Sequence, residues 1–175
     1  MPANTTPAPI TTPAPTSSSI DGTASFHWLV PDEYEDAHGR VVWVCAPEAR
    51  AAWHVRSSCG HPDVNGGATR VNHWSLGIEI VNRQEGTDAF SAWQVDITAQ
   101  IVRYCWAKYP NLRHVVSHAR LDPDRRTDPG PSFPWGRLRQ LVRGGGPGDL
   151  PAPVARILRR AARGTRAPDG GGCEG

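Results

Sequence analysis

One short stretch of the chain, residues 117–135, gathers most of the side chains that could carry out chemistry. Its sequence, SHARLDPDRRTDPGPSFPW, places the imidazole of His118, the guanidinium of Arg126 and the carboxylate of Asp128 close together. The Pro-Gly-Pro run after Asp128 restricts the loop, because proline fixes φ and glycine permits a tight turn. An imidazole and a carboxylate on a stiff loop supply two of the three protein ligands of a typical hydrolytic zinc site, and a nearby cation could stabilise an oxyanion.

Each of these residues also has an ordinary structural explanation. A histidine that follows an apolar run often lies at the edge of a core, and an aspartate before Pro-Gly often caps a turn. Taken one at a time, His118 and Asp128 favour that explanation. The chemical hypothesis therefore depends on what the rest of the chain places beside them.

Hydrophobic periodicity predicts the elements that must position these groups. The apolar run at 114–117 predicts a short buried strand that presents His118 at its end. Residues 75–81 alternate between apolar and other side chains, which predicts a second strand. On that strand Glu79 shares a face with Gly77, where a ligand would have room.

Two further strands are predicted near the start of the domain. Residues 25–30 and 41–46 should pair as a hairpin, and the second reads as an apolar strand covered on both faces. The polar, glycine-rich residues 55–70 predict a long surface loop of the kind that borders sites.

Two helices complete the predicted scaffold. Residues 91–109 form the clearest one, because Ser91 begins a capping-box pattern and Pro110 disfavours continuation. Pro134 suits the first turn of a last helix. With the strands, this pattern predicts a single α/β domain with a mixed central sheet of four or more strands, flanked by helices.

Four blocks of sequence carry a resemblance to a known family. They are SFHWLV at 25–30, AWH at 52–54, NHWSLGIEI at 72–80 and HARLDPDRRTDPGPSFPW at 118–135. In the same order, they resemble blocks of the type-2 N-acetylmuramoyl-L-alanine amidases, a zinc family that also includes phage amidase lysozymes and animal peptidoglycan recognition proteins. Four blocks in order are far more specific than any one of them. The resemblance covers about residues 22–143 and implies an amidase-like fold.

The resemblance implies roles for four of the residues. His118 and Asp128 would be zinc ligands, and Zn²⁺ would be the cofactor. Glu79 would take a proton from the attacking water and hand it to the leaving L-alanine amine. Arg126 stands where many relatives carry a lysine that steadies the tetrahedral oxyanion; arginine keeps the charge but loses the option of proton transfer. Without the family, Glu79 is as well explained as a solvated strand residue.

Two more residues, His54 and Asn72, resemble positions that line the site of the family. The resemblance implies that both contact substrate. The alternative for Asn72 is a turn residue.

One family feature is missing from the sequence. The family's first zinc ligand is a histidine on an N-terminal strand of the form V-[IV]-H, but no histidine precedes His27 here. Three explanations compete: the chain as given lacks its true N-terminus, another residue such as His27 or His54 completes the site, or the protein is an inactive amidase. The presence together of the four residues assigned above favours the first explanation.

Composition excludes several other classes of protein. A net charge of +2, from 19 basic and 17 acidic residues, gives no case for a nucleic-acid partner. The four cysteines form no C-x-x-C pair, so a cysteine-based zinc knuckle is not expected. No apolar run approaches the roughly 20 residues of a membrane span, so no membrane partner is expected. The N-terminus also lacks the pattern of a secretory signal, which leaves a cytoplasmic or a cell-wall location open.

The chain is therefore expected to contain one domain between two tails. Residues 1–21 read as a Pro/Thr/Ser-rich disordered tether, residues 22–143 as the amidase-like domain, and residues 144–175 as a Gly/Pro-rich linker with a basic tail. The expected activity is zinc-dependent hydrolysis of the amide between N-acetylmuramic acid and L-alanine in peptidoglycan or muropeptides, by a monomer. The alternative is a non-catalytic peptidoglycan-binding module of the same fold, with an incomplete zinc site.

Overall fold

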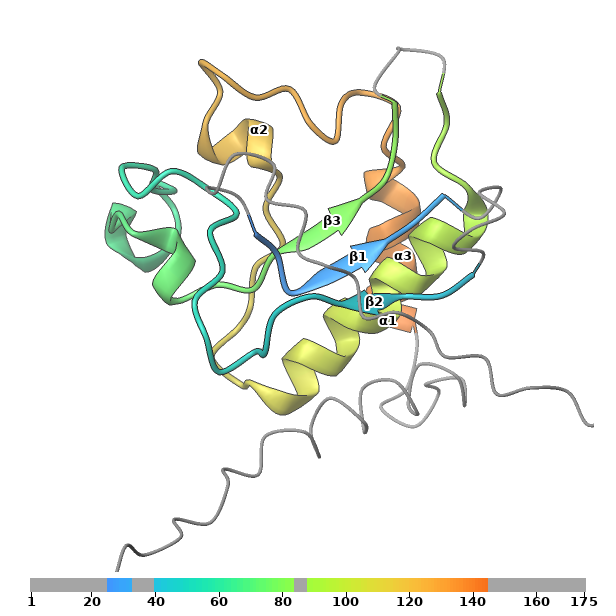
Figure 1. Cartoon of the computed structure of the whole chain (residues 1–175), viewed down its shortest axis with the longest axis horizontal. Coiled ribbons are helices and arrows are strands. Elements are labelled where there is room, and N and C mark those ends of the chain that lie inside the picture. Colours follow the sequence, from blue (N-terminus) through green and yellow to red (C-terminus); the bar gives the residue numbers. More distant parts are fainter. Residues whose placement is uncertain (1–24, 33–39, 84–87, 145–175) are drawn as a thin grey trace, which may run out of the picture.

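Three short strands form a mixed sheet within the residues that the structure describes, which are 25–32, 40–83 and 88–144 of the computed structural model. The strands are β1 (Trp28–Val30), β2 (Trp43–Val44) and β3 (Ile78–Ile80), in the order β2-β1-β3. β1 pairs antiparallel with β2 and parallel with β3 (Figure 1). The predicted hairpin and the predicted mixed sheet are therefore confirmed.

Three α-helices accompany the sheet in the described part of the chain. They are α1 (Ala92–Lys108), α2 (His118–Leu121) and α3 (Trp135–Gly144), and single 3-10 turns occur at Asn65–Gly67 and Val71–His73. α1 packs against the sheet and against α3. The one-turn helix α2 lies away from the helices α1 and α3 (Figure 1). The α/β architecture predicted from the sequence is thus observed.

The start of α1 is fixed as the sequence predicts. Ser91 Oγ accepts a hydrogen bond from the N–H of Gln94 at 3.1 Å, and Gln94 Oε1 accepts one from the N–H of Ser91 at 3.0 Å. The same Gln94 side chain donates to the carbonyl oxygens of Pro31 and Val81, which follow β1 and β3. The capping box therefore also ties the helix to the ends of two strands.

Two adjoining apolar clusters form the core beneath the sheet. The first joins Trp28 and Val30 of β1 to Ile97, Ile101 and Cys105 of α1. The second cluster joins α1 to α3 and consists of Phe90, Val95, Ala99, Phe133 and Leu138. Burial of these faces is the main force that holds the scaffold together.

The strand predicted at 41–46 is shorter and more exposed than expected. Only β2 forms there, and Val41 and Val44 are exposed to solvent. The expectation that both faces are covered is therefore wrong. Among the described strands β2 pairs only with β1, and within the run only Val42 is buried.

The strand predicted at 114–117 does not form. Val115 is 41% exposed, and no backbone hydrogen bond joins residues 114–116 to any other described segment. The structure places no strand on the outer edge of β3 within the described ranges, so this extended segment has no ladder partner. The expected four or more strands are therefore three in this part of the chain, and His118 begins a helix instead of ending a strand.

The described residues include no helix that is long and apolar enough to cross a membrane. The expectations about the tether at 1–21 and the tail beyond Gly144 fall outside the residues that the structure describes.

Candidate active site

The loop that carries α2 closes on itself and brings His118 to Asp128. Ser117 Oγ accepts from the N–H of Arg120 at 3.1 Å and caps α2. The N–H of Ala119 donates to the carbonyl oxygen of Asp128 at 3.0 Å. His118 Nδ1 lies 3.0 Å from Asp128 Oδ2, and both side chains keep part of their surface open to solvent. The two side chains therefore meet at hydrogen-bond distance, and each is of a type that zinc accepts as a ligand.

Glu79 in the middle of β3 faces the same region. Burial raises the pKa of the Glu79 carboxyl above its ordinary value, although part of the side chain is open to solvent. The negative charge of Asp128 raises this pKa further, and the positive charge of Arg126 lowers it in part. The three charges therefore lie within electrostatic reach of one another, and a raised pKa makes a carboxylate a stronger proton acceptor.

His54 lies near His118 and is a neutral imidazole. Its Nε2 donates to Ser75 Oγ at 2.8 Å, because the Ser75 hydroxyl itself donates to the carbonyl oxygen of Val71 at 2.6 Å. Its Nδ1 is buried, and no described residue meets it with full hydrogen-bond geometry. Burial, then the nearby His27 and His118, lower the pKa of His54 to about 4. The contact of His54 with substrate stays a prediction.

The space expected beside Gly77 is already filled. A Cβ on Gly77 would lie 2.7 Å from His54 Cγ, so the imidazole packs directly on the glycine backbone. The room inferred from this glycine is therefore used by His54 and not by a ligand. The glycine is needed because a larger residue would displace the ring.

Asn72 holds the backbone that carries His54. Its residue is 3% exposed, and its side chain accepts from the N–H groups of His54 and Val55 and donates to the carbonyl oxygen of Val55. It also lines a hollow of about 190 Å³, together with Ser75 and Leu76. The contact of Asn72 with substrate stays a prediction.

His27 does not complete a metal site. It is 0% exposed, its Nδ1 accepts from the N–H of Gly77 at 3.0 Å and its Nε2 donates to the carbonyl oxygen of Arg50 at 3.0 Å. Both ring nitrogens of His27 are therefore hydrogen-bonded to backbone groups. Its burial lowers the pKa of His27, in keeping with a neutral structural imidazole.

The donor set matches a zinc site in part. One imidazole nitrogen and one carboxylate, 3.0 Å apart, are ligands that zinc accepts. Residues 25–32, 40–83 and 88–144 contain no group of three or more His, Cys, Asp or Glu side chains that could hold a metal ion. The described residues therefore offer two of the three protein ligands that a catalytic zinc site normally has.

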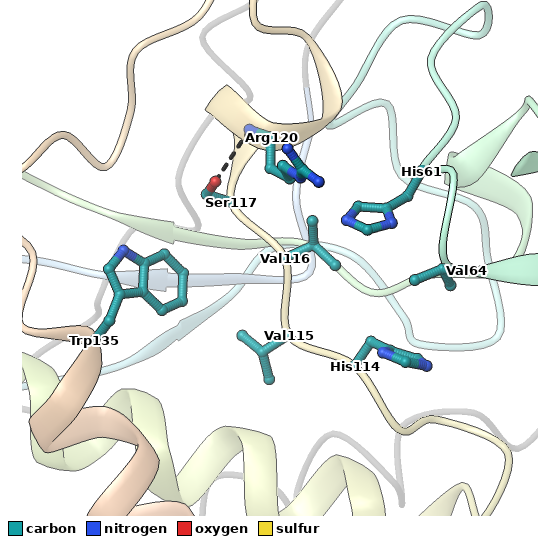
Figure 2. A pocket seen from close by; sticks show the side chains of 8 residues that line it. All are labelled: His61, Val64, His114, Val115, Val116, Ser117, Arg120 and Trp135. Carbon is teal, nitrogen blue, oxygen red and sulfur yellow. Dashed lines mark hydrogen bonds between the residues drawn. The ribbon is translucent and has the colours of Figure 1, made fainter.

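A hollow of about 330 Å³ runs along the extended segment that precedes α2. Figure 2 shows His61 and Arg120 at one end and Trp135 at the other, with Val115 and Val116 between them. His118 and Asp128 do not line this hollow. It is therefore a neighbour of the candidate site and not a part of it.

Sequence reasoning missed the contacts that hold the site together. The ion pair of Arg56 with the buried carboxylate of Asp122 and the bond of His54 to Ser75 join segments far apart in the chain. No local pattern marks such partners, and only their polar character in a loop near the motif could have suggested them.

The chain belongs to the N-acetylmuramoyl-L-alanine amidase family, Amidase_2, whose sequence model matches residues 3–131. It is 35% identical over 129 residues to N-acetylmuramoyl-L-alanine amidase AmiD of Escherichia coli K12, covering 69% of this chain and 45% of AmiD. It is 38% identical over 99 residues to 1,6-anhydro-N-acetylmuramyl-L-alanine amidase AmpD of Salmonella typhimurium, covering 55% of this chain and 48% of AmpD. The chain thus spans about half the length of these curated relatives.

Solved structures of the same family share the fold. AMPDH3 of Pseudomonas aeruginosa in complex with anhydromuramic pentapeptide aligns with a TM-score of 0.59 and 26% identity, covering 85% of this chain and 61% of that one. AmiD from E. coli, in complex with anhydro-N-acetylmuramic acid-L-Ala-D-gamma-Glu-L-Lys, aligns with a TM-score of 0.55 and 31% identity, covering 82% of this chain and 62% of AmiD. The predicted family and fold class are confirmed.

Proposed function

We propose that the chain hydrolyses the amide between N-acetylmuramic acid and L-alanine in peptidoglycan or its fragments. The observation that carries the proposal is the convergence of His118 on Asp128 at 3.0 Å, beside a carboxyl at Glu79 whose pKa is raised. The named activities of AmiD and AmpD support the same chemistry. AMPDH3 and AmiD, in complexes with anhydromuramyl peptides, support a muropeptide ligand.

The chemistry can be assigned to four side chains of the chain. His118 and Asp128 would hold a zinc ion, which when bound would polarise the amide carbonyl and lower the pKa of the attacking water. Glu79 accepts a proton from that water and passes it to the L-alanine nitrogen as the C–N bond breaks. Arg126 donates hydrogen bonds to the oxyanion of the tetrahedral intermediate.

The raised pKa of Glu79 suits this role. A general base works best when its pKa lies near the working pH, because it is then both largely deprotonated and basic enough. Burial is the largest cause of the raised pKa; the charge of Asp128 adds to it and the charge of Arg126 opposes it.

The proposal is tested with Glu79→Gln, His118→Ala and Asp128→Ala in the full chain. Glu79→Gln should remove nearly all release of L-alanyl peptide from an anhydromuramyl peptide while leaving the bound zinc unchanged. His118→Ala and Asp128→Ala should lose both zinc and turnover. Unchanged peptide release, followed by chromatography, in the His118 or Asp128 variant would show that the assignment is wrong.

A second candidate function is a non-catalytic peptidoglycan-binding module of the same fold. It is favoured by one observation, the lack of a group of three metal donors in the described residues. The two functions are separated by zinc stoichiometry and muropeptide affinity measured on one preparation. Zinc near zero together with retained muropeptide binding and no turnover would establish the module.

A further inference from the structure

The carboxylate of Asp122 is buried and forms a two-point ion pair with Arg56. The Asp122 side chain is 1% exposed; Arg56 donates from Nε to its Oδ2 at 2.8 Å and from Nη2 to its Oδ1. Burial alone would raise the pKa of the Asp122 carboxyl, but the hydrogen bonds and charge of Arg56 outweigh it and hold that pKa below its usual value. Such a fork fixes both the charge and the orientation of the carboxylate.

The backbone of Asp122 joins His118 to Arg126. Its N–H donates to the carbonyl oxygen of His118 at 2.9 Å. Its carbonyl oxygen accepts from the N–H of Arg125 at 3.1 Å and from the N–H of Arg126 at 2.9 Å. A residue that fixes Asp122 therefore fixes the backbone of both His118 and Arg126.

The loop needs such an external anchor. α2 contains four residues, and a helix this short has no stability of its own. Leu121 of the loop packs on the apolar cluster of Val55, Cys59 and Val71. Two ion pairs also join the loop to residues 55–71. One is the pair of Arg56 with Asp122, and the other is an exposed pair of Arg120 with Asp63 at 3.9 Å. Of the two ion pairs only that of Arg56 places a carboxylate out of contact with water.

Arg56 itself sits on a fixed segment. It follows His54 and Val55, whose N–H groups are held by Asn72, and its carbonyl oxygen accepts from the N–H of Cys59 at 3.0 Å. The ion pair thus links the segment that carries His54 to the loop that carries His118, Arg126 and Asp128.

We propose that Arg56 is a positioning residue: by its fork on Asp122 it sets where His118 and Arg126 lie relative to Glu79 and His54. The inference rests on the proposed amide hydrolysis for its catalytic readout. Arg56 acts through Asp122 and touches no reacting atom. Its removal should therefore disturb geometry in the candidate site without changing the groups that bind substrate.

The kinetic test compares Arg56→Met, Arg56→Lys and the control Asp63→Asn in the full chain on an anhydromuramyl peptide. Arg56→Met should lower kcat by about tenfold or more while KM changes by less than about twofold, because small displacements of catalytic groups cost rate more than affinity. Arg56→Lys should recover part of the loss, since lysine keeps the charge but not the fork. Asp63→Asn breaks the exposed pair between the same segments and should leave kcat unchanged.

A second readout does not depend on activity. Hydrogen exchange of the Ala119, Asp122 and Arg126 amides is measured by NMR and compared with that of Ile101 in α1. Arg56→Met should speed exchange of the three loop amides by about tenfold or more relative to Ile101, because a local anchor has been removed. Asp63→Asn should leave this ratio as it is.

The proposal is overturned if Arg56→Met lowers Tm but leaves kcat unchanged and the exchange ratio unaltered, since Arg56 would then only add global stability.

If Arg56→Met does not fold, a double variant with Arg56→Gln and Asp122→Asn avoids leaving the Asp122 carboxylate buried without its partner, and the same two readouts decide. If the unaltered chain hydrolyses no muropeptide, the proposed function fails, while the exchange ratio still decides whether Arg56 positions the loop.

Discussion

The scaffold helix α1 and the loop that carries α2 are held in place by different physical means. α1 buries an apolar face, including Ile97, Ile101 and Cys105, against the strands. The loop at 117–128 buries little apolar surface and is held by hydrogen bonds and an ion pair. Hydrophobic burial tolerates small shifts, whereas polar contacts demand a defined geometry. The chain thus uses its apolar residues for stability and its polar contacts to place the chemistry.

The largest expected effect comes from a substitution in the apolar face of α1. Ile101 is 1% exposed in the middle of α1, so Ile101→Ala should lower the free energy of unfolding by about 2–5 kcal/mol through lost burial and a residual cavity. Urea denaturation followed by circular dichroism measures the change. Ile101→Val is the control and should cost about 0.5–1.5 kcal/mol. Equal losses in the two variants would contradict the packing described.

A smaller effect is expected where the polar region meets the sheet. Gly77→Ala places a Cβ against the His54 ring and should cost about 1–3 kcal/mol, because the imidazole must leave its bond to Ser75. The matched control is Gly136→Ala, where a Cβ on α3 meets nothing within 4 Å. That control should stabilise the protein by about 0.5–1 kcal/mol, because alanine favours helix more than glycine does. Thermal denaturation of both variants tests the contrast, which fails if both changes have the same sign.

The buried imidazole of His54 should make stability depend on pH. Its pKa of about 4 lies below the usual 6.5, so between these values the unfolded chain binds the proton and the native protein does not. The stabilisation is complete above pH 6.5 and is lost as pH falls toward 4, by about 1–2 kcal/mol once partial solvent exposure is allowed for.

This pH dependence can be isolated by substitution. His54→Gln should show a smaller loss of unfolding free energy between pH 7 and pH 4.5 than the unaltered chain. The exposed His73 provides the control, since His73→Gln should leave the pH dependence as it was. Identical pH profiles for His54→Gln and the unaltered chain would refute the buried neutral state.

The smallest expected effect tests a polar contact on the scaffold side, the cap of α1. Ser91→Ala removes the cap of α1 and should lower the free energy of unfolding by about 1 kcal/mol. Ser91→Thr keeps the hydroxyl and should cost less. Urea denaturation measures both, and an alanine variant as stable as the threonine variant would argue against the capping box.

Patterns local in the chain were enough to predict much of the scaffold. The capping residues and Pro110 bound α1, and alternation in β3 places Glu79 away from the apolar side. These features depend on residues within a few positions of one another, where periodicity and capping act directly. The same reasoning was wrong for 114–117, because a strand needs a partner and periodicity does not supply one.

The sequence by itself determined the family, α1 with its boundaries, and the motif that carries His118, Arg126 and Asp128. Only the tertiary structure decided that Asn72 accepts a hydrogen bond from the backbone of His54 and that both ring nitrogens of His27 bond to backbone groups. It alone also revealed the ion pair of Arg56 with Asp122 on the loop. The reason is physical: secondary structure follows from neighbours in the chain, whereas a polar side chain's role depends on which distant group satisfies its hydrogen bonds.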